Sequence, residues 1–194
     1  TEREYNELIS GNDSNGDRVV GAPSLSVGNA DVMRGSDNDD SYDGGKGDDF
    51  ISGRNGNDDI YGGDGYDVLL GGDGDDKIEG GDGDDILIGG NGLDFLSGGE
   101  GADRFAFNTT QESRRDKSNR DVITDFNDSE GDKIDLSYIS SDLNFIGLDN
   151  FSGVEGEVRF EDGILQLNTD RDSRPEFEIQ LIGVDSLDLD DFIL

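Results

Sequence analysis

Residues 62–88 are three consecutive copies of one nine-residue unit, GGDGYDVLL, GGDGDDKIE and GGDGDDILI. Stepping by nine in both directions extends the unit without a gap from Ser26 to Ala106, which gives nine units. The first position is Gly in eight of them, and the fourth is Gly in seven, with Asn29 and Asn38 in the other two. A period held at several positions over so many units indicates a repeat architecture and not a flexible Gly-rich linker.

Two positions of the unit are the same in kind throughout. The sixth position is always acidic: Asp31, Asp40, Asp49, Asp58, Asp67, Asp76, Asp85, Asp94 and Asp103. The eighth position is always large and apolar: Met33, Tyr42, Ile51, Ile60, Leu69, Ile78, Leu87, Leu96 and Phe105. The repeat therefore pairs one carboxylate with one core side chain in each unit.

This pattern predicts an all-β fold, a parallel β-roll (β-helix) over residues 26–106. We expect each unit to form a six-residue Gly-rich turn ending in Asp, then a three-residue strand. The middle side chain of that strand points inward, because successive strand side chains alternate between faces. Two units make one coil, and stacked coils place the eighth-position side chains in two facing rows.

The predicted core is too thin to fold without help. Ordering the backbone costs about 1–2 kcal/mol per residue, and stacked acidic turns repel one another. Ca²⁺ would bridge such turns well, because it accepts six to eight oxygen ligands with loose geometry, whereas Mg²⁺ requires a strict octahedron. We therefore predict several Ca²⁺ ions, up to about seven, because nine units give that many pairs of turns on the same side. The expected ligands are the nine sixth-position Asp side chains, with backbone carbonyls near Asn38, Gly47, Gly56, Gly65, Gly74, Gly83 and Gly92.

The composition excludes several other classes of site. The 194 residues contain 48 Asp and Glu against 15 Lys and Arg, a formal net charge of −33, and no Cys or His. There is consequently no thiolate or imidazole zinc site, no Ser-His-Asp or Cys-His nucleophile and no disulfide. The acidic balance argues against nucleic acid and anionic membranes as partners. No apolar run is long enough for a membrane span.

The units are similar to the GGxGxDxUx nonapeptide of RTX (repeats-in-toxin) proteins, most clearly in Gly62–Leu70, Gly71–Glu79 and Gly80–Ile88. The resemblance implies a right-handed β-roll that folds on Ca²⁺ after export. The region from Gly101 onward also resembles the segment behind such rolls in serralysin-type proteases and secreted lipases. The matching residues are Gly101–Phe107, Asp121–Phe126, Asp132–Ser137, Phe151–Gly153 and Asp191–Leu194.

That second resemblance implies a route of export. In the family, an acidic residue followed by three apolar ones at the chain end belongs to an uncleaved type I secretion signal, here Asp191, Phe192, Ile193 and Leu194. The other interpretation of these residues is a last strand that packs, and both can hold. The chain starts at Thr1 without a signal peptide, so we expect an extracellular, non-catalytic module, secreted by the type I machinery, with a parent catalytic domain N-terminal to Thr1.

The flanks of the repeat are less regular. Residues 1–25 are expected to be a cap or linker. Residues 107–194 are expected to be a β-rich segment, with a hairpin at Gly163 and a short helix or turn within Ser186–Asp191. Its predicted strands are 122–126, 133–136, 156–160, 164–167 and 177–182. The loop from Asp170 to Glu176 has Arg174 and Pro175 where an EF-hand loop needs an oxygen ligand and Gly, so no metal is predicted there.

Two further predictions concern surfaces. Outward positions of one sheet carry Phe50, Val68, Leu70, Ile86 and Ile88, and a stripe of this size is expected to be covered by part of 107–194 or by a partner. The RTX rolls that form the R-modules of mannuronan C5-epimerases suggest an alternative function, binding of alginate or another polysaccharide. The basic cluster that could contact such an anion is Arg114, Arg115, Lys117 and Arg120. Paired carboxylates would suffice for a glycosidase, but in so acidic a chain their proximity carries no information.

Overall fold

The computed structural model describes residues 30–114 and 119–194. These residues form two sheets, made of sixteen strands, and one short 3-10 helix. The strands of the roll are β1 (Val32–Arg34), β2 (Ser41–Lys46), β3 (Phe50–Asn55), β4 (Asp59–Asp64), β5 (Val68–Asp73), β6 (Lys77–Asp82), β7 (Ile86–Asn91), β8 (Phe95–Glu100) and β9 (Arg104–Ala106). The later elements are β10 (Val122–Ile123), β11 (Lys133–Asp135), β12 (Asn144–Gly147), β13 (Glu157–Glu161), β14 (Ile164–Asn168), β15 (Phe177–Leu181), η1 (Leu189–Asp191) and β16 (Phe192–Ile193).

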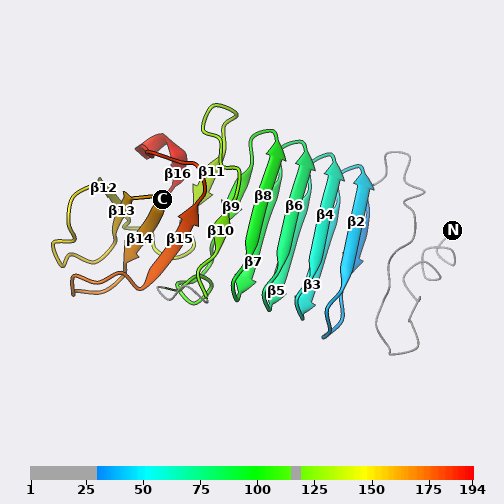
Figure 1. Ribbon diagram of the computed structural model, residues 1–194, viewed down its shortest axis with the longest axis horizontal. Coiled ribbons are helices and arrows are strands. Elements are labelled where there is room, and N and C mark those ends of the chain that lie inside the picture. Colours follow the sequence, from blue (N-terminus) through cyan, green and yellow to red (C-terminus); the bar gives the residue numbers. More distant parts are fainter. Residues whose placement is uncertain (1–29, 115–118) are drawn as a thin grey trace, which may run out of the picture.

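Odd and even strands of the repeat separate into two facing parallel sheets, which confirms the predicted β-roll. One sheet has the order β1-β3-β5-β7-β9, and the other contains β8-β6-β4-β2 (Figure 1). The register advances by two units at each step, so that Ile51 lies beside Leu69 and Leu69 beside Leu87. Every eighth-position side chain from Tyr42 to Phe105 is buried. The two facing rows are therefore the core of the roll.

The division of each unit into turn and strand differs from the prediction. Strands β2 to β8 are six residues long and not three, because they continue through the first three positions of the next unit. Gly45 pairs with Gly63, and Gly63 with Gly81, so the second-position glycines lie within the sheet. Only the fourth, fifth and sixth positions form the turn. The Gly residues of the first two positions suggested a turn, but hydrogen bonding between parallel strands places them in the sheet.

The segment after the repeat continues both sheets instead of forming a separate layer. Strands β11 and β16 extend the first sheet beyond β9, and β10 and β15 extend the second beyond β8 (Figure 1). The five predicted strands of this segment correspond to β10, β11, β13, β14 and β15, whereas β12 was not predicted. The hairpin between β13 and β14 turns at Asp162 and Gly163, both with positive φ, which suits a two-residue turn.

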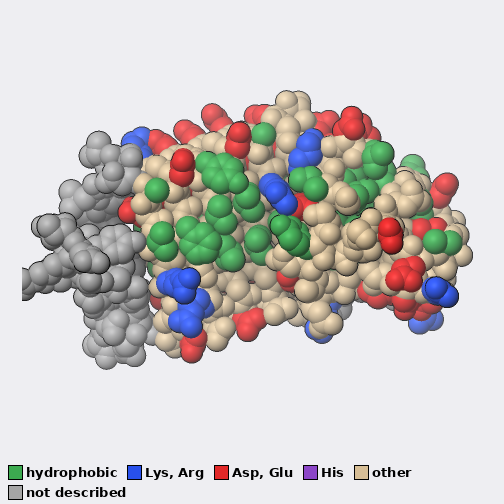
Figure 2. Space-filling model, turned by 180° about the vertical axis from the view of Figure 1, so that it is seen from behind, with side chains coloured by type: hydrophobic (Ala, Val, Ile, Leu, Met, Phe, Trp, Pro, Cys, Tyr) green, Lys and Arg blue, Asp and Glu red, His purple; other side chains and the backbone are tan. Residues whose placement is uncertain are grey.

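The described residues of 107–114 and 119–194 do not provide the predicted cover for the apolar stripe. This segment lies at the end of the roll, and Figure 2 shows hydrophobic side chains at the surface over the first sheet. Neighbouring side chains of the stripe shield one another, so Phe50, Val68, Leu70, Ile86 and Ile88 are half-buried, while Val32 beside them is 51% exposed. In the described part of the chain, no helix is long and apolar enough to cross a membrane.

Candidate metal-binding turns

From Asp49 onward, the sixth-position Asp side chains join each coil to the next through one of their two oxygens, whereas Asp40 accepts from the amide and hydroxyl of Ser36. The Oδ1 atom accepts a hydrogen bond from the amide of the sixth-position Asp one coil earlier, as from Asp58 to Asp76 at 2.8 Å and from Asp67 to Asp85 at 2.8 Å. The same bond recurs along both edges of the roll. Because each Asp lies two residues before a buried core side chain, the stacking of the coils fixes a column of carboxylates on each edge.

The second oxygen of these carboxylates has no partner. It is buried and accepts no hydrogen bond in Asp49, Asp58, Asp67, Asp76, Asp85, Asp94 and Asp103. The residues themselves are at most 2% exposed. A buried carboxylate without compensation costs several kcal/mol, so the four on one edge of the roll and the three on the other need a proton or a cation to neutralise them.

Burial is also the main reason that their pKa values are raised. The pKa rises from 3.8 to about 6 for Asp49 and Asp58, and to about 7 for Asp76, Asp85 and Asp94. Backbone hydrogen bonds oppose this effect, and neighbouring carboxylates add to it. In the absence of a cation, the turns would thus hold protons that a free Asp would release.

The first-position glycines let a carboxylate oxygen and a carbonyl oxygen approach the backbone closely. A Cβ atom on Gly71 would lie 2.2 Å from Asp76 Oδ2 and 2.5 Å from the Gly89 carbonyl oxygen one coil later. Gly62 shows the same arrangement, with Asp67 Oδ2 at 2.3 Å and the Gly80 oxygen at 2.6 Å. Because Gly has no side chain, a carboxylate oxygen and a carbonyl oxygen of adjacent coils share this space.

The donor set fits Ca²⁺. All the groups are oxygens: backbone carbonyls and carboxylate oxygens without a partner, on turns that repeat from coil to coil. The fourth-position carbonyls named in the sequence analysis lie against the next coil: a Cβ on Gly65 would lie 2.2 Å from the Gly47 oxygen. These carbonyls stay a prediction, and the first-position carbonyls are the ones that the structure places beside a free carboxylate oxygen.

Comparison with known proteins gives one family. The model of the peptidase M10 serralysin C-terminal region matches residues 28–194. The chain belongs to this family. No curated protein sequence matches it. Among solved structures, the AlgE6R3 subunit of the mannuronan C5-epimerase from Azotobacter vinelandii is 27% identical, covering 91% of this chain and 84% of its own, with a TM-score of 0.45. The AlgE6R2 subunit of the same enzyme is 31% identical, covering 84% of this chain and 91% of its own, with a TM-score of 0.47.

In this serralysin C-terminal module, both carboxylate columns are longer than the sequence analysis predicted. The amide of Asp94 donates to Asp121 Oδ1 at 3.0 Å, and the amide of Asp103 donates to Asp132 Oδ1 at 2.9 Å. Strands β10 and β11 follow in register with β8 and β9. Each added Asp precedes an apolar residue by two positions, as in the repeat, but the steps are 27 and 29 residues instead of 18. The Asp-x-apolar spacing was therefore the sequence feature from which Asp121 and Asp132 could have been predicted to extend the columns.

The Asp121 carboxyl group is the most perturbed of the module. Asp121 is completely buried, its Oδ2 atom has no partner, and burial followed by the charge of Asp94 raises its pKa to about 9. The Glu112 carboxylate, also buried, contributes to the same shift. Nearby, the Asp125 carboxylate accepts hydrogen bonds from Ser97 Oγ and from the amides of Gly98 and Gly99.

The other predicted site residues are those of the basic cluster and of the chain end, and the structure does not bring the described members of the basic cluster together. Arg120 forms a salt bridge with Glu178, and both side chains are largely buried, whereas Arg114 is exposed and donates to Gln111. Arg115 and Lys117 lie outside the described residues. At the chain end, Asp191 closes a capping box with Asp188, and Phe192 and Ile193 form β16 beside β11. The last residues do pack as a strand, and their role in secretion stays a prediction.

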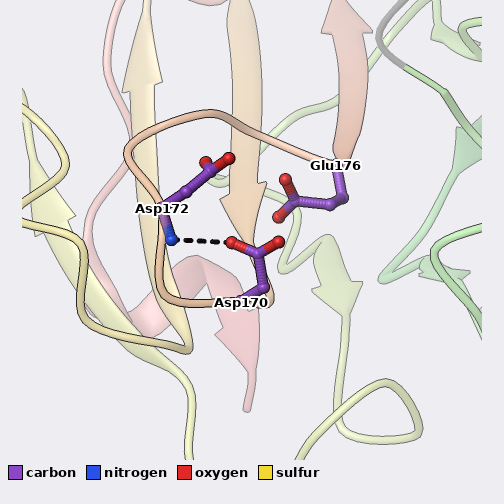
Figure 3. A group of neighbouring side chains, drawn as sticks. All are labelled: Asp170, Asp172 and Glu176. Atoms are coloured by element: carbon purple, nitrogen blue, oxygen red, sulfur yellow. Dashed lines mark hydrogen bonds between the residues drawn. The ribbon is translucent and has the colours of Figure 1, made fainter.

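Three carboxylates converge in the loop for which no metal was predicted. Oxygens of Asp170, Asp172 and Glu176 lie within 4.8 Å of one another (Figure 3). The loop's own amides already donate to them: Asp172 to Asp170 at 2.7 Å, Arg174 to Asp172 at 2.6 Å and Thr169 to Glu176 at 2.8 Å. Asp170 and Asp172 are exposed, so this group lacks the buried, unpartnered oxygens of the roll.

Proposed function

We propose that this chain is a calcium-binding, non-catalytic RTX module of a larger secreted protein, and that it folds when Ca²⁺ becomes available. The observation that carries the proposal is the column of buried Asp Oδ2 atoms without partners, each beside a first-position Gly. Membership of the serralysin C-terminal family supports the wider context, a module within a larger protein.

The residues of the roll divide the work of binding. In the folded roll, each Asp carboxylate is held in place by the hydrogen bond that its Oδ1 accepts from an amide of the preceding coil, which leaves Oδ2 for the ion. The first-position glycines admit the ion and supply carbonyl oxygens, as Gly89 does beside Asp76. Bound Ca²⁺ supplies the positive charge that neutralises these buried carboxylates.

Folding and binding are coupled in this scheme. The unfolded chain cannot present oxygens from two coils together, so each occupied site stabilises the folded state by RT ln(1 + [Ca²⁺]/Kd). Several weak sites therefore suffice, and dissociation constants of about 10⁻⁴–10⁻³ M are typical of extracellular modules. A chain that is unfolded at low calcium and folded outside the cell suits export in an unfolded form.

We further propose the type I route, with Asp191, Phe192, Ile193 and Leu194 as part of the signal. In the folded state these residues are engaged by β11 and by the capping box. They are therefore accessible to a transporter only before the C-terminal segment folds. Removal of residues 191–194 should abolish export from a host carrying the transporter, while export of the Asp128→Asn chain should be unchanged, as measured by the secreted fraction.

The test of calcium-dependent folding is a titration followed by circular dichroism. In EGTA the chain is expected to lack β structure, and Ca²⁺ should restore it cooperatively, whereas the same concentration of Mg²⁺ should not. Calorimetry of the same samples gives the number of ions bound. A chain that is fully β-structured in EGTA, or that takes up no Ca²⁺, would refute the proposal.

The polysaccharide alternative stays a prediction. Of its basic cluster, the described residue Arg120 is engaged by Glu178, so fewer cations face solvent than the sequence suggested. Calorimetric titration with mannuronate oligomers in the presence of Ca²⁺ would test it.

A further inference from the structure

The outward face of β1, β3, β5 and β7 is unlike the rest of this acidic molecule. Its apolar patch consists of Val32, Phe50, Val68, Leu70, Ile86 and Ile88, the outward side chains of a parallel register. The remaining outward residues at the repeat's seventh and ninth positions on these strands are Arg34 and Ser52, and none is acidic. The equivalent positions of β2, β4 and β6 include Asp43, Asp59 and Glu79.

Cations border this patch. Arg34 is exposed on β1, opposite Ser52, and Arg54 is exposed at the end of β3, where its Nη1 atom lies 3.4 Å from the Gly35 carbonyl oxygen. Figure 2 shows Lys and Arg side chains beside the hydrophobic ones on this face. Arg104, on the next strand, is neutralised by Asp135. An occupant of the patch should thus combine apolar side chains with negative charge.

The N-terminal segment of this chain has that chemistry. Residues 1–9, TEREYNELI, interleave three acidic residues and one Arg with three large apolar ones, so the segment is acidic on balance: Glu2, Arg3, Glu4 and Glu7 with Tyr5, Leu8 and Ile9. The chain enters the described structure at residue 30, directly before β1, where Val32 belongs to the patch. From there to Ile9 the chain can span roughly 70 Å when extended, whereas the patch is only about 15 Å across four strands. The segment is therefore long enough to return.

We propose that residues 1–9 dock on the apolar patch of the first sheet, with Tyr5, Leu8 and Ile9 against Val68, Leu70, Ile86 and Ile88, and with their glutamates near Arg34 and Arg54. A second copy of the chain suits the patch less well, because each copy carries a net charge of −33 and like-charged chains repel. Docking would cover the stripe that residues 107–194 leave open.

The absence of Cys from the chain makes the proposal directly testable. A single nitroxide label on Asn6→Cys, in saturating Ca²⁺, should broaden the methyl resonances of Val68, Leu70, Ile86 and Ile88. The methyl resonances of Ile182, exposed after β15, serve as the internal control and should keep their intensity. Circular dichroism of the same sample shows separately that the roll is folded, so a failure of calcium binding is distinguishable from a failure of docking.

Variants then test both halves of the contact. Leu8→Ser, at a position that precedes the repeat in the sequence, and Arg34→Glu should each restore the patch intensities, whereas Lys77→Glu, the matched exposed cation on the other sheet, should not. Equal intensities for patch and control methyls would overturn the proposal. So would broadening that appears when labelled chains without isotope are mixed with isotope-labelled chains, because that result would assign the patch to a second copy.

Discussion

Replacement of Asp76 by Asn should change stability in opposite directions with and without calcium. The Asn side chain keeps the shape of Asp, and its oxygen can still accept from the Asp58 amide, as Asp76 Oδ1 does at 2.8 Å. It removes the charge from the unpartnered Oδ2 beside Gly71. The substitution therefore isolates the buried charge from the packing of the turn.

The magnitude without calcium follows from the pKa. Burial raises the pKa of Asp76 from 3.8 to about 7, and three pH units correspond to about 4 kcal/mol of unfavourable free energy for the ionised form. Water near the turn screens part of this charge, so we expect Asp76→Asn to stabilise the calcium-free roll by about 2 kcal/mol at pH 8. With Ca²⁺ the sign reverses, because the variant lacks a charged ligand, and the midpoint of calcium-induced folding should rise by about tenfold or more.

The assay compares the two conditions on the same chain. Folding in EGTA at pH 8 is driven with an excluded osmolyte such as trimethylamine N-oxide, and folding by Ca²⁺ is followed without it. Asp75→Asn is the matched control: Asp75 is exposed, its Oδ1 accepts from the Leu93 amide at 2.9 Å, and small changes are expected in both conditions. A destabilised variant in EGTA, together with an unchanged calcium midpoint, would refute the assignment of Asp76 as a calcium ligand.

Three other predictions follow from the same turns. In EGTA the roll should be more stable at pH 5 than at pH 8. The folded state binds more protons than the unfolded state between the ordinary Asp pKa of 3.8 and the raised pKa values of about 6 for Asp58 and about 7 for Asp94. Osmolyte titrations at the two pH values measure this difference, and greater stability at pH 8 would contradict the prediction. Gly71→Ala should raise the calcium midpoint and lower the melting temperature, because the new Cβ would meet Asp76 Oδ2 and the Gly89 oxygen. Gly183→Ala is the control: no atom lies within 4 Å of the new Cβ, so the free energy of unfolding should fall only by the strain of the positive φ, about 1 kcal/mol. Asp121→Asn should reduce the number of ions found by calorimetry, while the exposed Asp128→Asn should leave it unchanged; equal stoichiometry in the two variants would show that the column ends at Asp94.

The sequence predicted the candidate site within the nine-residue repeat, residues 26–106, but not beyond it. The Asp at the sixth position and the apolar residue at the eighth position of each nine-residue unit predicted both the carboxylate columns and the two core rows. The prediction holds because each coil repeats the local geometry of the one before it. Asp121 and Asp132 escaped this reasoning because insertions of different length precede them. A sheet fixes register by hydrogen bonds between neighbouring strands, so a loop can leave the chain and return to the same ladder at any spacing.

The sequence by itself determined the repeating coil, its inward and outward side chains and the positions of the Asp carboxylates in the turns, because these depend on local periodicity. The tertiary structure alone decided which oxygen of each Asp is left without a partner, that the first-position carbonyls lie beside it, and that the C-terminal strands lengthen the sheets instead of covering the apolar patch. Those outcomes depend on how one coil sits on another. Contacts between coils are set by packing and hydrogen bonding across the stack, which no single unit contains.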